Sequence, residues 1–131
     1  MTDIEPMLPL DRTFDALYGL EILSLGEEEA TAQVQVTPDV LQPGGLVHGG
    51  VYASIAESLT SLATWKAVAP DGRSAHGLSN QTSFLRPILS GTIHATARRR
   101  HRGRTTWVWE VDITDDEGRA CVLVRTTVAV R

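Results

Sequence analysis

The sequence has 131 residues, of which 42% are hydrophobic and 21% are charged, and its formal net charge is −4. These values are ordinary for one soluble globular domain. The acidic balance argues against general binding to nucleic acid. Only one cysteine, Cys121, is present, so no disulfide can form within the chain. A reducing, cytoplasmic setting fits this cysteine usage.

The N-terminal third of the chain is expected to hold a loose lead-in, one short helix and two strands. Residues 1–10 form the lead-in, and residues 1–12 lack the apolar core of a signal peptide. Helical spacing, alternation and turn residues then predict a helix over 13–20, a strand over 21–25, a turn over 26–28 and a half-buried strand over 30–36.

A long helix follows a turn-rich loop at residues 42–48. From Gly49 the pattern is apolar and helical to about Ala69, and Pro70-Asp71-Gly72 is expected to end it. Glu57 is the only carboxylate in this helix. This charge and five Ser and Thr side chains make the helix unsuitable as a membrane span, so no contact with a membrane is expected.

After this helix the pattern changes to strands separated by short turns. It predicts four strands, over residues 74–85, 91–100, 105–114 and 119–130. Both faces of the last strand are apolar, which predicts a central position or cover on both sides. The order of elements predicts an α+β domain in which an antiparallel sheet curls around the long helix. The other face of the sheet then needs polar residues or a partner subunit.

The two predicted faces of the long helix differ in size and polarity. At 3.6 residues per turn, one face is aliphatic and carries Val51, Ile55, Leu59 and Leu62. The opposite face is small and hydroxylated, and carries Ala53, Ala56, Glu57, Thr60, Ser61 and Thr64. Such a face indicates close packing by a helix, a sheet or a ligand, and partial desolvation there would make Glu57 a better base. Alternatively, Glu57 is a solvated or hydrogen-bonded structural residue.

Other side chains have both a structural and a functional interpretation. His48 either caps the helix or contacts a substrate. Asn80, Thr82 and Phe84 either line a substrate pocket or only pack the sheet. Cys121 has no spaced partner for metal binding or nucleophilic chemistry and is interpreted as a core thiol. The histidines show no metal-ligand spacing, so no metal site is expected.

Several motifs of this chain resemble those of a known family. Gln42 lies six residues before His48, and Gly49 follows; Glu57 lies eight residues after that glycine, with Ser61 four residues further on. The chain is similar to hotdog-fold acyl-CoA thioesterases, above all the 4-hydroxybenzoyl-CoA type with a glutamate in the helix and the 1,4-dihydroxy-2-naphthoyl-CoA thioesterases of the phenylacetic-acid-degradation group. The likeness covers most of the chain and includes the stretches 82–87, 101–107 and 116–119.

This resemblance implies a hotdog fold and a role for each matching residue. In the family, the residue matching Glu57 is the base or nucleophile, and the one matching Gly49 holds the thioester carbonyl. Those matching Gln42, His48 and Ser61 help to position the thioester, water or product. The chemistry agrees, because a helix N-terminus can polarise a carbonyl and a carboxylate can attack it or activate water. Neither a metal nor a separate cofactor is implied, since coenzyme A is part of the substrate.

A basic run at residues 98–104 holds five of the 11 arginines and is expected at a hairpin between two strands. It could be a solvated turn, a signal for nucleic acid or localisation, or a site for coenzyme A phosphates, which arginine forks suit. The resemblance favours the third interpretation. The residues predicted to contact coenzyme A or the rest of the substrate are Asn80, Thr82, Arg86, Arg102, Gly103, Arg104 and Thr105. Arg104 stands where the benzoyl type has serine.

The spacing of Gly49 and Glu57 adds a prediction about assembly. Eight residues of helix are roughly 12 Å long, so one thioester could not easily touch both residues on one chain. Two antiparallel helices in a dimer would bring them together, and in the family the sites lie between subunits. We therefore predict an obligate homodimer with two shared sites, which pairs into a homotetramer.

The predicted function is hydrolysis of a (hydroxy)aromatic acyl-CoA to the free acid and coenzyme A. The alternatives are a thioesterase for aliphatic acyl-CoA, a non-catalytic acyl-CoA sensor and a hotdog dehydratase. The chain lacks the His-Phe-Pro or Asp/His signature of such dehydratases, and its Glu57–Ser61 pair favours hydrolysis over sensing.

Overall fold

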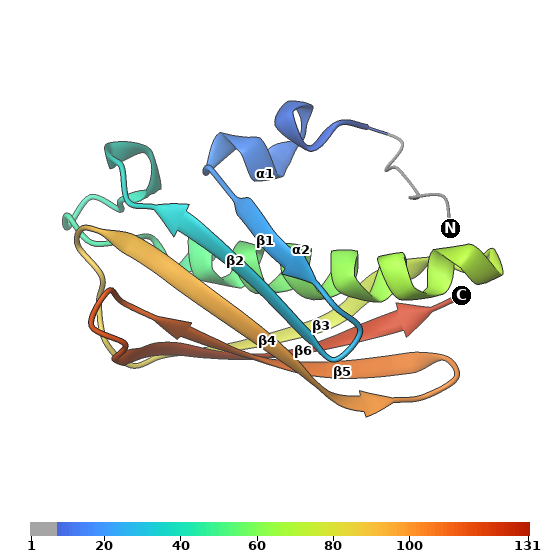
Figure 1. The fold of residues 1–131 in the computed structure, drawn as a ribbon. Coiled ribbons are helices and arrows are strands. Elements are labelled where there is room, and N and C mark those ends of the chain that lie inside the picture. The colour runs from blue at the N-terminus through green and yellow to red at the C-terminus, as the bar shows by residue number, and fades with distance from the viewer. Residues whose placement is uncertain (1–7) are drawn as a thin grey trace.

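The structure is a computed structural model that describes residues 8–131 (Figure 1). Its helices and strands are α1 (Phe14–Leu17), β1 (Glu21–Leu25), β2 (Glu29–Gln35), α2 (Gly49–Val68), β3 (Ala75–Phe84), β4 (Thr92–Arg102), β5 (Thr106–Thr114) and β6 (Ala120–Val130). The long helix and all six strands begin and end within two residues of their predicted positions. The predicted lead-in and the stretch tested for a signal peptide lie mostly outside the described residues.

One predicted helix was wrong in length, and the predicted position of the basic run was only partly right. The helix predicted over residues 13–20 has a single turn, because the chain leaves the helical conformation at Tyr18 and Gly19 adopts a φ of +79°. Strand β4 continues to Arg102, so most of the basic run lies in a strand, and the hairpin turn is confined to residues 103–105.

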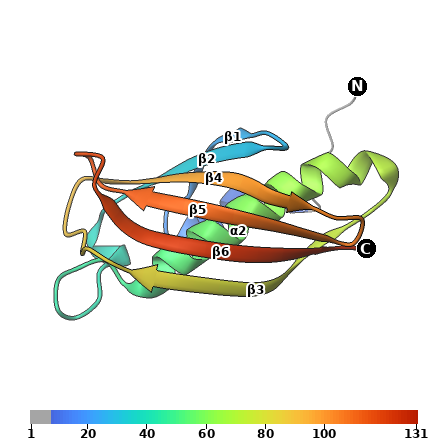
Figure 2. The ribbon, with the colours of Figure 1, turned by 90° about the horizontal axis from the view of Figure 1, so that it is seen from below.

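One antiparallel sheet of six strands curls around α2. The strand order is β1-β2-β4-β5-β6-β3, and α2 crosses one face of the sheet (Figures 1 and 2). Strands β1 and β3 form the two edges, and β6 lies between β5 and β3. This is the hotdog fold that the resemblance implied. In residues 8–131, no helix is both long and apolar enough to span a membrane.

The core lies between α2 and the concave face of the sheet. Alternate residues of β4 and β5 point into it and are almost fully buried, including Trp107 and Trp109. Cys121 is also buried, as expected for a core thiol. The other face of the sheet is polar and carries ion pairs such as Arg100 with Glu110, at 2.8 Å, and Arg98 with Asp112, at 3.2 Å. Polar side chains therefore cover the face that the helix leaves open.

The predicted division of α2 into an aliphatic and a hydroxylated face was partly wrong. Ile55 and Leu59 are buried as expected, but so are Ala56, Thr60 and Thr64, which were placed on the opposite face with Glu57. The two threonines can be buried because their hydroxyls are fully engaged. Each donates to the backbone carbonyl four residues earlier, at 2.8 and 2.7 Å.

These hydroxyls also tie the helix to the sheet. Thr64 Oγ1 accepts the indole N–H of Trp109 at 2.9 Å, and the hydroxyls of Thr60 and Thr126 lie 2.8 Å apart. All four side chains are buried. The polar groups of the core therefore fix how α2 sits on β5 and β6, because an unpartnered polar group there would carry a desolvation cost.

Thr64→Val should destabilise the fold by about 1–3 kcal/mol, because it leaves the buried Trp109 N–H without an acceptor while keeping the side-chain shape. Urea unfolding followed by tryptophan fluorescence measures this change. Thr127→Val, at a half-buried position on the same sheet, is the control and should change the unfolding free energy by less than about 0.5 kcal/mol. Equal effects of the two variants would contradict the role of the Thr64–Trp109 bond.

Candidate active site

The N-terminus of α2 is capped by His48. The ring Nδ1 of His48 accepts the Gly50 amide at 2.8 Å, and the His48 backbone is extended. The structural interpretation of His48 therefore holds, and its side chain is exposed beside the first turn. Among the described residues, the Gly49 amide donates no hydrogen bond. This free N–H at the positive end of a 20-residue helix can hold an anionic or carbonyl oxygen.

A tight loop brings Gln42 to the same place. Its backbone amide donates to Leu46 O at 2.8 Å, and Gly45 turns the chain with a φ of +89°. The side-chain oxygen of Gln42 accepts the Gly44 amide, which fixes the orientation of the side chain. Its amide nitrogen remains available as a donor. The loop thus presents an oriented carboxamide near Gly49.

A cavity of about 420 Å³ opens beside Gly49. Its lining is mostly apolar and includes two of the predicted catalytic residues and one predicted coenzyme A contact: Gln42, Leu46, Val47, Gly49, Tyr52, Phe84, Leu85, Arg86, Pro87 and Val122. The ring of Phe84 lies over Gly49, where a Cβ atom would be 2.9 Å from ring carbons. Glycine at this position therefore lets an aromatic ring reach the helix N-terminus.

Glu57 and Ser61 do not line this cavity. The Glu57 side chain is exposed and lies against β3, where a Cβ at Gly77 would be 3.0 Å from Glu57 Oε1. Ser61 is half-buried one turn further along α2. A single chain therefore separates Glu57 from Gly49, as the helical spacing predicted. The desolvation of Glu57 expected from the sequence does not occur within one chain.

Of the predicted substrate contacts on β3, Asn80 bonds to the helix and Thr82 bonds to Asn80. Asn80 donates from Nδ2 to the Ala53 carbonyl at 3.0 Å, and Thr82 donates to Asn80 Oδ1 at 2.7 Å. Neither residue lines the cavity. In one chain, their observed role is to hold β3 against α2.

Most of the basic run is occupied by contacts within the chain. Arg98 and Arg100 pair with carboxylates across the sheet. Arg99 donates to the Glu27 carbonyl at 2.8 Å, and Arg102 lies 3.6 Å from the Glu27 carboxylate. The guanidinium groups of Arg99 and Arg102 both stack on Trp107, at 4.8 and 5.3 Å from its ring centre.

The remaining predicted coenzyme A contacts lie in two separate places. Arg104 has no ion pair among residues 8–131 and sits in the β4–β5 turn with Gly103 and Thr105. Arg86 lines the cavity near Gly49. The Arg86 amide bonds to Cys121 at one end of β6, and the Thr105 carbonyl bonds to Val130 at the other. Nine residues of strand span roughly 30 Å, so one chain holds these contacts far apart.

A cluster that sequence analysis missed lies beside Glu57. Tyr18 and Ser58 both donate to Asp15 Oδ1, at 2.9 and 2.6 Å, so α1 is fixed to α2. Burial raises the pKa of Tyr18, and the charges of Asp15 and Glu57 add to that shift. Nothing in the spacing of Asp15 indicates this contact, because it joins residues 43 positions apart.

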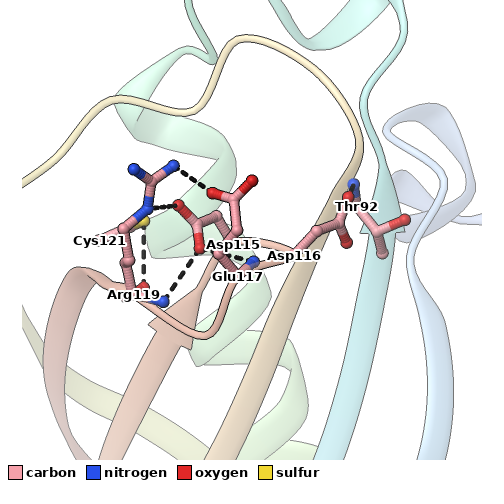
Figure 3. A network of polar contacts seen from close by, with 6 residues as sticks. All are labelled: Thr92, Asp115, Asp116, Glu117, Arg119 and Cys121. Carbon is pink, nitrogen blue, oxygen red and sulfur yellow. Dashed lines mark hydrogen bonds and ion pairs between the residues drawn. The ribbon is translucent and has the colours of Figure 1, made fainter.

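A network of polar contacts holds the β5–β6 turn together and joins it to the start of β4 (Figure 3). The largely buried Asp115 accepts the amides of Glu117 and Arg119, at 3.0 and 2.9 Å, and the Arg119 Nε at 2.7 Å. Asp116 accepts the Thr92 amide at 3.2 Å, which joins the turn to the start of β4. The residues predicted only to form a turn thus also anchor the start of β4.

Three comparisons with known proteins identify the family of this chain. A family model described as the thioesterase superfamily matches residues 44–122. Rv1847, an esterase candidate of Mycobacterium tuberculosis, is 44% identical over 115 residues, which are 85% of this chain and 82% of that protein. The 1,4-dihydroxy-2-naphthoyl-CoA hydrolase of Listeria monocytogenes is 37% identical over 113 residues, covering 86% and 91%. The structure of a mutant of thioesterase PA1618 from Pseudomonas aeruginosa superposes with a TM-score of 0.88 at 34% identity, covering 92% and 87%.

The chain therefore belongs to the thioesterase superfamily, because the family model covers more than half of it. It is a thioester hydrolase, as the resemblance implied. The family model spans most of the loop, all of α2 and most of the sheet, and so includes Gly49, Glu57 and Arg86.

Asp115 should make the stability of this region depend on pH. Burial raises its pKa, but the bonds from Arg119 and Glu117 outweigh burial and hold the pKa below its usual value. Ionised Asp115 therefore stabilises the folded state at neutral pH, and this contribution is lost as the pH falls below about 4. The difference in thermal midpoint between wild type and Asp115→Asn should be largest at pH 7 and narrow toward pH 3.

Asp39→Asn, at an exposed position, is the control. Its thermal midpoint should differ little from that of wild type at every pH between 7 and 3. A difference for Asp115→Asn that stays constant from pH 7 to pH 3 would contradict this account of the turn.

Proposed function

We propose that the protein hydrolyses the thioester of hydroxyl-bearing aromatic acyl-CoA and releases the free acid and coenzyme A. The observation that carries this proposal is the apolar cavity with aromatic walls beside the free Gly49 amide. The name of the Listeria monocytogenes relative supports an aromatic acyl group, since that protein is a 1,4-dihydroxy-2-naphthoyl-CoA hydrolase. The reaction as proposed uses no metal and no separate cofactor.

The thioester carbonyl oxygen accepts the Gly49 amide, and the helix dipole stabilises the negative charge that develops there. The Glu57 carboxylate either attacks the carbonyl carbon or takes a proton from a water that attacks it. If Glu57 attacks, the C–S bond breaks to leave a mixed anhydride, which a water then hydrolyses to the free acid and the Glu57 carboxylate. If water attacks, breaking the C–S bond releases the free acid directly. In both cases the thiolate of coenzyme A takes up a proton derived from the water. Gln42 donates to the carbonyl or the water, His48 also helps to hold the thioester, and Ser61 positions the water or the product.

This chemistry needs two chains, because Gly49 and Glu57 lie eight residues apart on one rigid helix, roughly 12 Å. The exposed edge strand β3 supports a way to join them. Its Gly77 end lies beside Glu57, and its Phe84 end lies beside Gly49. Antiparallel pairing of two β3 edges across a two-fold axis would bring the Glu57 of one chain toward the Gly49 of the other.

The same pairing would join the two groups of coenzyme A contacts. The first residue of β3, Ala75, pairs with Val130, which also bonds to Thr105. The last residue of β3, Phe84, lies two residues before Arg86. Two antiparallel β3 strands would therefore place the Arg104 turn of one chain near the Arg86 of the other. The same two-fold axis would thus bring Glu57 toward Gly49 and Arg104 toward Arg86. This agreement favours an obligate homodimer with two shared sites. Two such dimers would form the homotetramer.

Glu57→Ala should reduce kcat for aromatic acyl-CoA by at least about a hundredfold, because it removes the base or nucleophile. Thiol release measures both the loss of kcat and the substrate class. The substrates are 4-hydroxybenzoyl-CoA, 1,4-dihydroxy-2-naphthoyl-CoA, phenylacetyl-CoA, and short-chain and long-chain acyl-CoA. Glu21→Ala removes an exposed carboxylate from β1 and should leave kcat within about twofold. Turnover that survives in Glu57→Ala would mean that another residue is the base or nucleophile, and His48 would be tested next.

Arg104→Ala should raise the KM for acyl-CoA about fivefold with little change in kcat, since one exposed charged contact contributes about 1 kcal/mol. Arg100→Ala is the matched control, because Arg100 already pairs with Glu110 at 2.8 Å. The Arg104 effect should shrink at high salt, where exposed charges are screened. Equal KM values for the two variants would refute a specific role of Arg104.

A further inference from the structure

A buried hydroxyl without a partner belongs to the wall of the proposed site. The Tyr52 side chain is 3% exposed, and its hydroxyl is the one buried side-chain polar atom in residues 8–131 that lacks a hydrogen-bond partner. Burial raises the pKa of Tyr52 to about 12. The nearby Ile88 backbone offsets this shift in part, but the contact does not have the geometry of a hydrogen bond. The group therefore stays protonated near neutral pH and can donate.

Such a hydroxyl weakens the fold unless something binds it. Native proteins leave few buried polar groups unpaired, and each one carries a desolvation cost. Phenylalanine would fill nearly the same space at this position without that cost. A group that enters the cavity and bonds to the hydroxyl would explain why tyrosine is present.

Tyr52 is well placed to meet such a group. It lies three residues after Gly49, about 4.5 Å further along α2, and both residues line the same cavity. The rings of Tyr52 and Phe84 are 6.2 Å apart and tilted by 51°. A thioester carbonyl held at Gly49 would therefore direct an attached ring between these aromatic walls, toward Tyr52.

The Tyr52 hydroxyl is buried within one chain, so a substrate group can reach it only when a neighbouring wall of the cavity moves. Phe84 is the wall residue best placed to move, because its ring lies over Gly49 and next to the Tyr52 ring and its side chain is 61% exposed. An exposed ring can turn outward with little loss of buried area, whereas Tyr52 is held by the surrounding core. The volume of about 420 Å³ lies within the range of roughly 300–1,000 Å³ that is usual for small-molecule sites.

From these observations, and on the basis of the proposed function, we propose that Tyr52 determines specificity. Its hydroxyl hydrogen-bonds a hydroxyl group on the aromatic ring of the acyl substrate. Tyr52 thereby selects hydroxyaroyl thioesters over unsubstituted aroyl thioesters, while Gly49 and Glu57 perform the chemistry. Loss of the Tyr52 hydroxyl removes the selection but leaves the reaction itself intact.

The test compares kcat/KM for 4-hydroxybenzoyl-CoA and benzoyl-CoA in wild type and Tyr52→Phe. The preference of the wild type for the hydroxylated substrate should fall about fivefold in the variant, the usual effect of one neutral hydrogen bond. The rate for benzoyl-CoA should stay within about twofold. The thermal midpoint of Tyr52→Phe should rise, because the unpaired hydroxyl is gone.

Tyr18→Phe is the matched control, since it removes the other tyrosine hydroxyl of the chain. That hydroxyl donates to Asp15 at 2.9 Å and does not line the cavity. The substrate preference should not change in this variant, and its thermal midpoint should fall. A preference that also stays unchanged in Tyr52→Phe, together with a higher midpoint, would mean that the Tyr52 hydroxyl has no ligand and would overturn the proposal.

Wild-type protein provides a second test in case Tyr52→Phe does not fold. A hydroxyl fixed in the cavity wall selects one ring position, so one of the 2-, 3- and 4-hydroxybenzoyl thioesters should exceed the other two. Equal kcat/KM values for all three isomers would overturn the proposal. Failure of the proposed function looks different, because the wild type would then release no thiol from any aromatic acyl-CoA.

Discussion

The rigid length of α2 is the constraint on which the rest of this structure depends. A helix rises 1.5 Å per residue, so the Gly49 amide and the Glu57 carboxylate are held roughly 12 Å apart whatever the sheet does. The buried threonine hydroxyls, the Trp109 indole and the Asn80 side chain fix α2 on the sheet, so the two groups cannot approach by a shift of the helix. Under the proposed function, the carbonyl-binding end and the carboxylate of one chain would therefore belong to different sites.

The edge strand β3 lies beside both of the separated groups, Glu57 and Gly49. It contacts Glu57 near its start and Gly49 through Phe84 at its end, and its neighbouring turns carry the two groups of arginines proposed for coenzyme A. It is also long, and most of its residues are exposed. A strand edge of this kind is a template for pairing. The length, the exposure and the unpaired edge of β3 in one chain are thus the features that a two-fold partner would use.

Much of this fold could be predicted from the sequence because its signals are local. Alternation and turn residues gave the six strands, and the apolar run from Gly49 gave the helix. The short spacing from Gln42 to Ser61 predicted the thioesterase family. Sequence reasoning failed where long-range contacts decide. The burial of Thr60 and Thr64 depends on bonds to β5 and β6, and the cluster of Asp15, Tyr18 and Ser58 joins distant segments. The unpaired Tyr52 hydroxyl could not be predicted, because only the packing around a side chain tells whether its polar atom has a partner.

The most direct test of the central claim is complementation between two defective subunits. Gln42→Ala and Glu57→Ala chains with different tags are expressed together, and dimers that contain one of each are purified. If the site is shared, one of the two sites in each mixed dimer regains both residues, and thiol release should recover to about half of the wild-type rate per dimer. A mixed dimer no more active than the average of its two parents would contradict the shared site.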